Sequence, residues 1–249
     1  DGRTDPHGEH RDNYVHADGH GIESLLEPVR KLGVGLDLIR VYTEKDGIQH
    51  NEKRTAHHAA HDAVERPPRV LVPLAEGFEE IEAITIIDVL RRASCDVIVA
   101  GIPAGPITAS RKTRHLADAS LAEVLLWPFD AIVLPGGRPG ADALAADEGL
   151  RQKIWEHFAS GALTAAICAA PMALDAAGVL AGRRFTCHPT AAPEIRTGIP
   201  TGQRVETDGH LITGQAAGSA MEFALAIVRA LCGDAKLTEV NRGLLARME

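Results

Sequence analysis

From Arg69 onward, short apolar runs alternate with segments whose apolar residues recur at helical spacing. Runs such as RVLVPLA and DAIVL are typical of strands buried on both faces of a parallel sheet. The segment SAMEFALAIVRAL has apolar residues three or four apart, which indicates a helix packed by one face.

The pattern predicts strands over 69–75, 96–100, 130–134, 163–167, 184–187 and 211–214, and helices over 79–93, 140–160 (broken near Asp147), 169–177 and 219–231. This alternation predicts a doubly wound α/β sandwich, whose ligands bind at the carboxyl ends of the strands. Residues 101–119 are irregular and predict at most a small hairpin.

The first 68 residues have a different composition. Eight of the twelve histidines of the chain lie there, interleaved with Asp, Glu, Gly and Arg. The segment contains no pattern that would make a core alone, and its histidine spacings match no specific set of metal ligands. We therefore interpret residues 1–68 as a largely disordered or loosely packed extension, and 69–249 as the α/β domain, with the boundary at Pro67 and Pro68.

Composition excludes several classes of function. The net charge is −8, which is unlike the basic surface of a nucleic-acid-binding protein. No apolar run is long enough to span a membrane, and no secretory leader is visible. The four cysteines are widely spaced and form no C-x-x-C pair, which argues against a disulfide framework and for a reducing compartment. We expect a cytoplasmic protein, and the sequence gives no evidence of a bound metal or organic cofactor.

Residues 163–171, LTAAICAAP, predict a sharp strand-to-helix turn. The apolar run ends at Ile167, small residues surround Cys168, and Pro171 suits the first turn of a helix. At such an elbow, Cys168 would lie near free N–H groups at the positive end of a helix, which favours its thiolate. The alternative is a buried, inert cysteine in tight packing, since cysteine is among the most buried residue types.

Three more features follow predicted strands. Glu80 and Glu82 lie about 200° apart around the first helix, so one of them should point inward, where burial would raise the pKa of its carboxyl. Gly136 and Gly137 form either a tight turn or a backbone N–H donor for an oxyanion. His188 follows a fourth strand, and Cys187 before it should face the opposite way, which makes a disulfide between Cys168 and Cys187 an unfavoured pairing.

Together, the motifs GFEEIE (77–82), LPGG (134–137), AAICAAP (165–171) and CHP (187–189) resemble the ThiJ/PfpI superfamily. The similarity covers about residues 69–245, with the motifs in the same order, and MEFALAIVRAL (221–231) resembles a helix near the end of that domain. The branch that it resembles is that of the parkinsonism-associated protein deglycase and its bacterial relatives.

This resemblance implies a flavodoxin-like sandwich that forms a homodimer. It implies that Cys168 is the redox-sensitive nucleophile, that Glu82 hydrogen-bonds it, and that His188 lies nearby. The oxyanion N–H groups fall on Gly137 and Ala169. Two arginines match positions near an anion site in this branch: Arg92 and Arg111.

Several positions depart from the pattern of this branch. Gln215, Ala216 and Ala217 stand in place of Arg-Gly-Pro, Ala170 in place of Gly, and Cys187 in place of Thr. Intracellular proteases of the superfamily have a histidine directly after the nucleophile, whereas this chain has Ala169. Glutamine amidotransferases of similar fold need His-x-Glu, and His188 is followed by Pro and Thr.

Three functions are consistent with these residues. The first is a glutathione-independent glyoxalase and protein deglycase, in which Cys168 attacks methylglyoxal-type 2-oxoaldehydes or glycated side chains and Glu82 moves the proton. The second is a redox sensor or holding chaperone, in which Cys168 is oxidised to sulfinic acid. The third is a binding or structural dimer with an inert cysteine, whose thiol pKa would be about 8.5.

Overall fold

The structure, a computed structural model, describes residues 66–247. These residues belong to a compact unit that begins at Arg66. The predictions made for the histidine-rich extension fall almost entirely outside the described residues and remain predictions. Within residues 66–247, no helix combines the length and the apolar composition that crossing a membrane requires.

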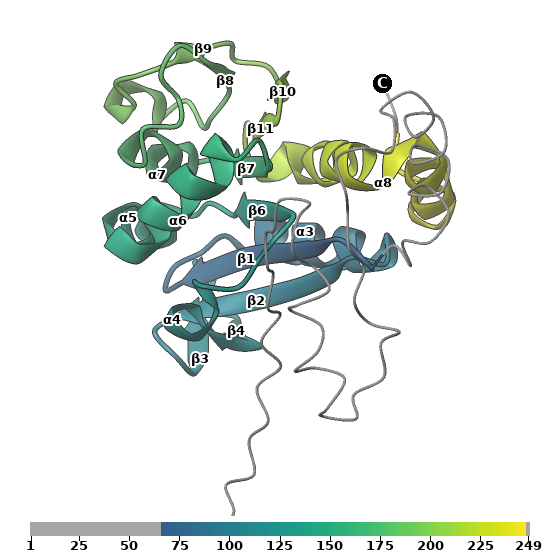
Figure 1. The fold of residues 1–249 in the computed structure, drawn as a ribbon, viewed down its shortest axis with the longest axis horizontal. Helices are drawn as coiled ribbons and strands as arrows, with labels where there is room; N and C mark the ends of the chain where they lie inside the picture. The colour runs from purple at the N-terminus through teal and green to yellow at the C-terminus, as the bar shows by residue number, and fades with distance from the viewer. Residues whose placement is uncertain (1–65, 248–249) are drawn as a thin grey trace, which may run out of the picture. The chain divides into compact units, whose positions relative to one another are not determined.

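A seven-stranded sheet forms the centre of the unit, in the order β10-β11-β7-β6-β1-β2-β5 (Figure 1). Neighbouring strands are parallel except for β10, which is antiparallel to β11. The strands of this sheet are β1 (Arg69–Ala75), β2 (Asp96–Ile102), β5 (Ala119–Ser120), β6 (Ala131–Leu134), β7 (Leu163–Ile167), β10 (Val205–Asp208) and β11 (Leu211–Gly214). The expected doubly wound, mainly parallel sheet is therefore confirmed.

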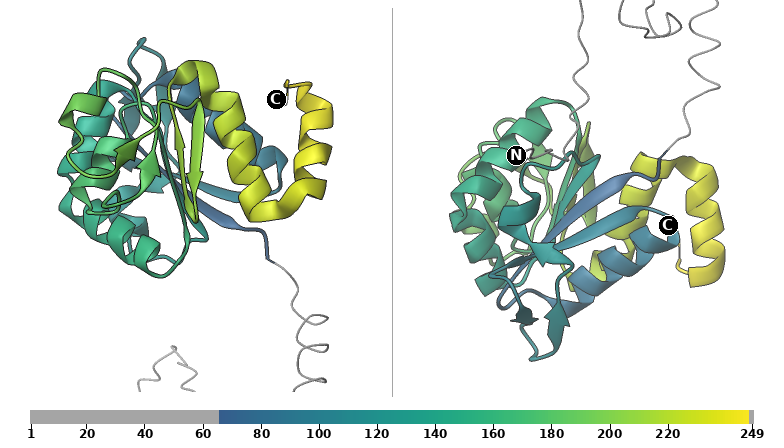
Figure 2. Two further views of the ribbon diagram at one scale, coloured as in Figure 1. Left: turned by 90° about the horizontal axis from the view of Figure 1, so that it is seen from above. Right: turned by 60° about the horizontal axis from the view of Figure 1, so that its bottom comes forward.

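Helices cover both faces of this sheet (Figures 1 and 2). They are α3 (Glu80–Arg92), α4 (Leu121–Val124), α5 (Arg138–Ala146), α6 (Glu148–Ala159), α7 (Pro171–Ala176) and α8 (Ala220–Leu244). Successive residues of β1 belong to different cores: Val70 and Val72 pack with α3 and α8, whereas Leu71 packs with α4 to α7. Because side chains alternate along a strand, a strand between two helical layers must be apolar on both sides, as its sequence is.

The local predictions differ from the structure mainly at element ends. The predicted break near Asp147 is confirmed, since Asp147 ends α5 and caps α6 by accepting the N–H of Leu150 at 2.7 Å. The helix predicted over 219–231 continues to Leu244, although Gly233 interrupts its geometry. The strand predicted over 184–187 is shorter. Two small pairs lie outside the main sheet: the antiparallel hairpin of β3 (Pro106–Thr108) with β4 (Arg114–Leu116), and β8 (Arg184–Phe185) with β9 (Ile199–Pro200).

The central strands should carry most of the folding energy. Leu134 of β6 is fully buried, whereas Leu126 is 95% exposed. We expect Leu134→Ala to lower the free energy of unfolding by about 2–5 kcal/mol, because it leaves a cavity in the core. The same substitution at Leu126 should change it by less than about 0.5 kcal/mol. Urea unfolding measures both, and equal effects of the two substitutions would contradict this description of the core.

Candidate active site

The site lies where three neighbouring parallel strands end. β1 leads through a short turn to α3, β6 leads to Gly136, and β7 leads to Cys168. The register pairs Leu134 with Ala166, so β6 and β7 end at the same level of the sheet. The fold thereby gathers a carboxyl, a glycine backbone and a thiol at one edge.

Gly136 is the point at which these groups meet. A Cβ added there would lie 2.6 Å from Oε2 of Glu82, 2.7 Å from Cβ of Cys168 and 2.8 Å from the carbonyl oxygen of Ile167. These distances are far below van der Waals contact, so only glycine fits between the two side chains. Gly137 is constrained as well: its φ is 89°, and a Cβ there would collide with the backbone of Gly77 and Phe78.

Glu82 is the inward glutamate of α3, and its side chain is fully buried. Oε2 accepts the N–H of Gly136 at 2.8 Å. Oε1 is buried and has no hydrogen-bond partner among the described residues, and Cys168 lies beside this carboxyl, across Gly136. Burial raises the pKa of Glu82 to about 7, and the Cys168 thiol and the N–H of Gly136 oppose this only in part.

The other two glutamates of the motif have structural roles. Glu79 caps α3 by accepting the N–H of Glu82 at 2.8 Å. Glu80 points outward and binds the loop after β3, accepting from the hydroxyl of Ser110 at 2.8 Å and the N–H of Arg111 at 2.6 Å. These bonds fix the start of α3 and hence the direction of Glu82.

Cys168 connects β7 to α7 in an unusual conformation. Its φ is 64°, in the left-handed region that residues other than glycine rarely adopt. Its N–H donates to the carbonyl of Gly214 at 2.9 Å, and its carbonyl accepts the N–H of His188 at 2.8 Å. Both neighbouring segments therefore hold the backbone of Cys168 in place, and they leave its side chain half-buried.

The sequence predicts that the start of a helix lowers the pKa of the Cys168 thiol. This prediction is wrong when the neighbouring Glu82 is ionised, because the pKa is then raised. Burial, together with the negative charge of Glu82, raises the pKa of Cys168 to about 12. The backbone N–H groups of Gly137 and Ala169 face the sulfur and lower its pKa, but by less. The helix α7 has only six residues and begins at Pro171, so it contributes little. Glu82 and Cys168 are best described as a pair that shares one proton.

His188 lies at the same edge of the sheet and is half-buried. The backbone N–H of Thr190 donates to Nδ1 of its ring at 3.3 Å, and the hydroxyl of Thr190 lies 2.8 Å from the same nitrogen. Because a backbone N–H can only donate, Nδ1 holds a lone pair, and the neutral ring carries its proton on Nε2. Cys187, next to it, is buried in the opposite core, and it forms no disulfide.

The two candidate arginines lie in different places. Arg111 is exposed on the loop held by Glu80, close to the start of α3. Arg92 is the last residue of α3, about 15 Å along the helix from Glu82, and it pairs with Asp88 at 2.7 Å. The chain therefore does not bring Arg92 to the site, because both ends of one helix cannot reach the same edge of the sheet.

One arrangement near the site has no counterpart among the sequence predictions. Arg138 directly follows Gly137 and binds Glu194 through two nitrogens, at 2.5 and 2.7 Å. This bidentate ion pair joins the start of α5 to the segment after His188. In the sequence, the only sign of this ion pair is an arginine directly after the two glycines. Nothing in the sequence pattern indicates that its partner is Glu194, 56 positions away.

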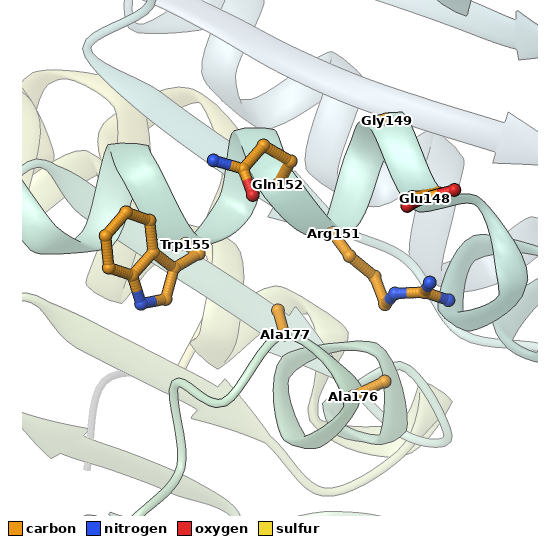
Figure 3. Close-up of a pocket in the computed structure, with 7 residues that line it drawn as sticks. All are labelled: Glu148, Gly149, Arg151, Gln152, Trp155, Ala176 and Ala177. Atoms are coloured by element: carbon orange, nitrogen blue, oxygen red, sulfur yellow. The ribbon is translucent and has the colours of Figure 1, made fainter.

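An open pocket of the described residues lies away from this site. It measures about 750 Å³ and lies between α6 and the end of α7, lined mainly by residues of α6 that include Arg151 and Trp155 (Figure 3). None of Cys168, Glu82 and His188 lines it. Among residues 66–247, no group of three or more His, Cys, Asp or Glu side chains could hold a metal ion.

The burial of Glu82 should make stability depend on pH. Its pKa is about 7 in the folded protein and 4.5 in its ordinary state, so the folded protein binds more protons between these values. Stability should therefore fall as pH rises through that window, by at most about 3–4 kcal/mol. In Glu82→Gln, which keeps the shape and cannot ionise, this fall should be absent. Urea unfolding at pH 5 and pH 8 measures it, and an equal pH dependence in both proteins would refute the assignment.

The convergence at Gly136 predicts a second effect. Gly136→Ala should lower the free energy of unfolding by about 1–3 kcal/mol, because the methyl group overpacks the space between Glu82 and Cys168. Gly243→Ala is the matched control, since a Cβ on that helical glycine meets nothing within 4 Å. A tolerated alanine at position 136 would mean that the two side chains are not held together as described.

Known proteins share this arrangement of strands and the sequence around it. The chain matches the model of the DJ-1/PfpI family over residues 68–230. It is 42% identical over 178 residues to Protein dj-1beta of Drosophila melanogaster, covering 70% of this chain and 95% of that protein. It is 35% identical over 184 residues to the glutathione-independent glyoxalase DJR-1.2 of Caenorhabditis elegans, covering 73% of this chain and 97% of that protein.

A longer plant relative and a solved structure agree with this. Protein DJ-1 homolog B of Arabidopsis thaliana is 39% identical over 183 residues, which is 73% of this chain but only 42% of that protein. The crystal structure of Drosophila melanogaster DJ-1beta superposes with a TM-score of 0.71 at 39% identity, covering 73% of this chain and 100% of that one. On both sequence and structure, the chain belongs to the DJ-1/PfpI family.

Proposed function

We propose that this protein is a glutathione-independent glyoxalase that converts methylglyoxal-type 2-oxoaldehydes into 2-hydroxy acids. The observation that carries the proposal is the pair of Cys168 and Glu82, in which a nucleophile and a carboxyl of pKa about 7 share one buried space. A general acid or base works best when its pKa is near the operating pH. A relative that is 35% identical bears the name of this activity, which supports the same assignment.

The pair supplies both the nucleophile and the proton carrier. When it has lost one proton, the remaining proton can reside on Glu82 and leave Cys168 as a thiolate. The sulfur then forms a bond to the aldehyde carbon of methylglyoxal, and the carbonyl oxygen takes the proton from Glu82 to give a hemithioacetal and an ionised Glu82. The N–H groups of Gly137 and Ala169, which lower the pKa of the thiol, are the donors that would stabilise the developing oxyanion.

Proton transfer between adjacent carbons follows. Ionised Glu82 removes the hydrogen from the former aldehyde carbon and returns it to the neighbouring carbon. The hydroxyl proton of the hemithioacetal moves to the oxygen of that neighbouring carbon, which gives a lactoyl thioester. Water then breaks the carbon–sulfur bond, releases lactate and restores the thiol. His188 assists by donating a hydrogen bond from Nε2 to the oxygen of the neighbouring carbon. Nε2 is available because the contacts with Thr190 are made by Nδ1. On a glycated side chain, Cys168 would bond to the former aldehyde carbon, the bond from that carbon to the side chain would break, and the side chain would leave with a proton; the same later steps would then give deglycase activity.

We further propose that the protein works as a homodimer in the cytoplasm. Helix α3 exposes Ile81 by 59% and Ile84 by 41%, on the helix that also carries Glu82. Apolar side chains of this size on one helix face suit an interface between copies. The four free thiols suit a reducing compartment.

A redox sensor or holding chaperone is the second candidate, and one observation favours it. The sulfur of Cys168 already has backbone donors, from Gly137 and Ala169, and a carboxyl partner that can be protonated near pH 7. The same groups could hold the oxygens of a sulfinic acid. Peroxide titration followed by intact mass tests this: saturable gain of two oxygens at Cys168 supports it, and indiscriminate oxidation of all four cysteines counts against it.

Substitution at the pair tests the glyoxalase. Cys168→Ser should reduce lactate production from methylglyoxal to background, because the nucleophile is lost. Glu82→Gln should reduce it by about 10²–10⁴-fold, because positioned proton transfer is lost. Enzymatic assay of released lactate is the measurement, and Cys232→Ser, which changes a thiol in α8, is the control that should keep full activity.

Two results would overturn the proposal. If Glu82→Gln kept the normal rate, Glu82 would not be the proton carrier. If the wild-type protein produced no lactate while Cys168 remained reduced and correctly folded, the sensor would become the better reading.

A further inference from the structure

Two cysteines outside the site lie against each other. Sγ of Cys95 is 3.8 Å from Sγ of Cys232, although 137 positions separate them in sequence. Cys95 is 7% exposed and directly precedes β2, and Cys232 is half-buried in α8. The sulfur atoms are in van der Waals contact. Side-chain rotations that move each sulfur by less than about 2 Å would bring the two to the bonding distance of about 2.05 Å.

This pair is separate from the candidate active site. Cys168 follows the carboxyl end of β7, whereas Cys95 precedes the amino end of β2. Because β7, β6, β1 and β2 are parallel neighbours, the two positions lie at opposite edges of the sheet. Chemistry at Cys95 and Cys232 is therefore independent of the proposed glyoxalase.

The backbone around the pair positions both thiols. On one side, the N–H of Cys95 donates at 3.0 Å to the carbonyl of Leu90, which lies in the last turn of α3. On the other side, Gly233 has φ 81° and ψ 171°, so α8 turns a corner directly after Cys232. Figure 2 shows this corner, where the last part of α8 (yellow) folds back beside its first part. Cys232 thus sits at the bend of α8, against the start of β2.

A small oxidant can reach the pair. A cavity of about 400 Å³ opens beside it, lined by Cys95 together with Arg66, Pro67, Arg69, Ser94 and Asp96. Cys232 is itself partly exposed. Burial, the neighbouring Cys232 and the charge of Asp130 raise the pKa of Cys95 to about 12, and Lys236 opposes this by less. Cys232 is the more exposed of the two thiols, so it is the one that an oxidant meets first.

We propose that Cys95 and Cys232 form a redox-active dithiol that hydrogen peroxide converts into an intramolecular disulfide, joining the bend of α8 to the start of β2. The Cys232 thiolate attacks peroxide: a sulfur–oxygen bond forms, the oxygen–oxygen bond breaks, and hydroxide leaves and takes a proton to become water. The Cys95 sulfur then attacks the sulfenic sulfur of Cys232: the disulfide bond forms, the sulfur–oxygen bond breaks, and a second water leaves. Two thiols lose two electrons and two protons, and one peroxide is reduced to two waters.

The test uses the full chain carrying Cys168→Ser, so that the proposed nucleophile takes up no oxygen. The protein is titrated with hydrogen peroxide, unfolded in N-ethylmaleimide to block remaining thiols, and examined by intact mass and by peptide mapping without reduction. We expect two thiols to disappear together, the mass of the chain before blocking to fall by two hydrogens, and the peptides of Cys95 and Cys232 to be linked. A thiol reductant should reverse the change.

Cys187 provides the matched control, because it is buried to the same degree as Cys95 but has no thiol beside it. In the same Cys168→Ser background, Cys187→Ala should leave the linked peptide unchanged, and Cys232→Ser should leave Cys95 fully blockable. The proposal is overturned if Cys232 gains oxygen while Cys95 stays reduced, or if the linkage joins two chains, which electrophoresis without reductant detects. It is also overturned if Cys187 is oxidised as readily as Cys95.

Discussion

The Glu82 carboxyl and the Cys168 thiol occupy one buried space, which the backbone of Gly136 closes from a third side. Two acidic groups that are desolvated together resist ionising together, so the first proton leaves this pair near pH 7 and the second is held far more tightly. A solvent-exposed glutamate and cysteine at the same sequence positions would titrate independently, and neither would be suited to passing a proton at neutral pH.

The rest of the fold holds the Glu82 carboxyl and the Cys168 thiol next to each other. Three parallel strands end at the same edge, which brings α3, the two glycines and Cys168 together from distant parts of the sequence. Glu79 and Glu80 fix the start of α3, so that Glu82 points inward. The bonds of the Cys168 backbone to Gly214 and His188 hold its left-handed conformation, which costs about 1–3 kcal/mol and persists because its surroundings impose it.

Much of this could be predicted from the sequence. The continuous apolar runs of β1 and β6 indicated a buried parallel sheet, because only a strand with helices on both faces is apolar at every position. The helical angle between Glu80 and Glu82 required one of them to point inward, and the structure gives Glu82. The pKa of Cys168 was the main error, because a helix terminus can be seen in sequence while the charge of a carboxyl from another element cannot.

Pairings between distant positions were also beyond the sequence. The contact of Cys95 with Cys232 depends on how α8 bends at Gly233 and packs on α3, and no local spacing encodes it. The same holds for the ion pair between Arg138, at the start of α5, and Glu194, which follows it by 56 positions in the sequence. The extension of α8 to Leu244 was missed because Gly233 reads as a helix end, although the chain resumes its helix after the bend.

The shared proton is tested most directly by the pH dependence of Cys168 alkylation by iodoacetamide, followed by peptide mapping in the wild-type protein and in Glu82→Gln. The account predicts that in the wild-type protein the rate rises with the first ionisation of the pair, near pH 7, and then reaches a plateau. In Glu82→Gln the step near pH 7 should vanish, and the thiol should titrate once, at a pKa below the value of about 12 that it has beside the ionised carboxyl. Identical titration curves in the two proteins, each with a single step at an ordinary thiol pKa, would contradict the account.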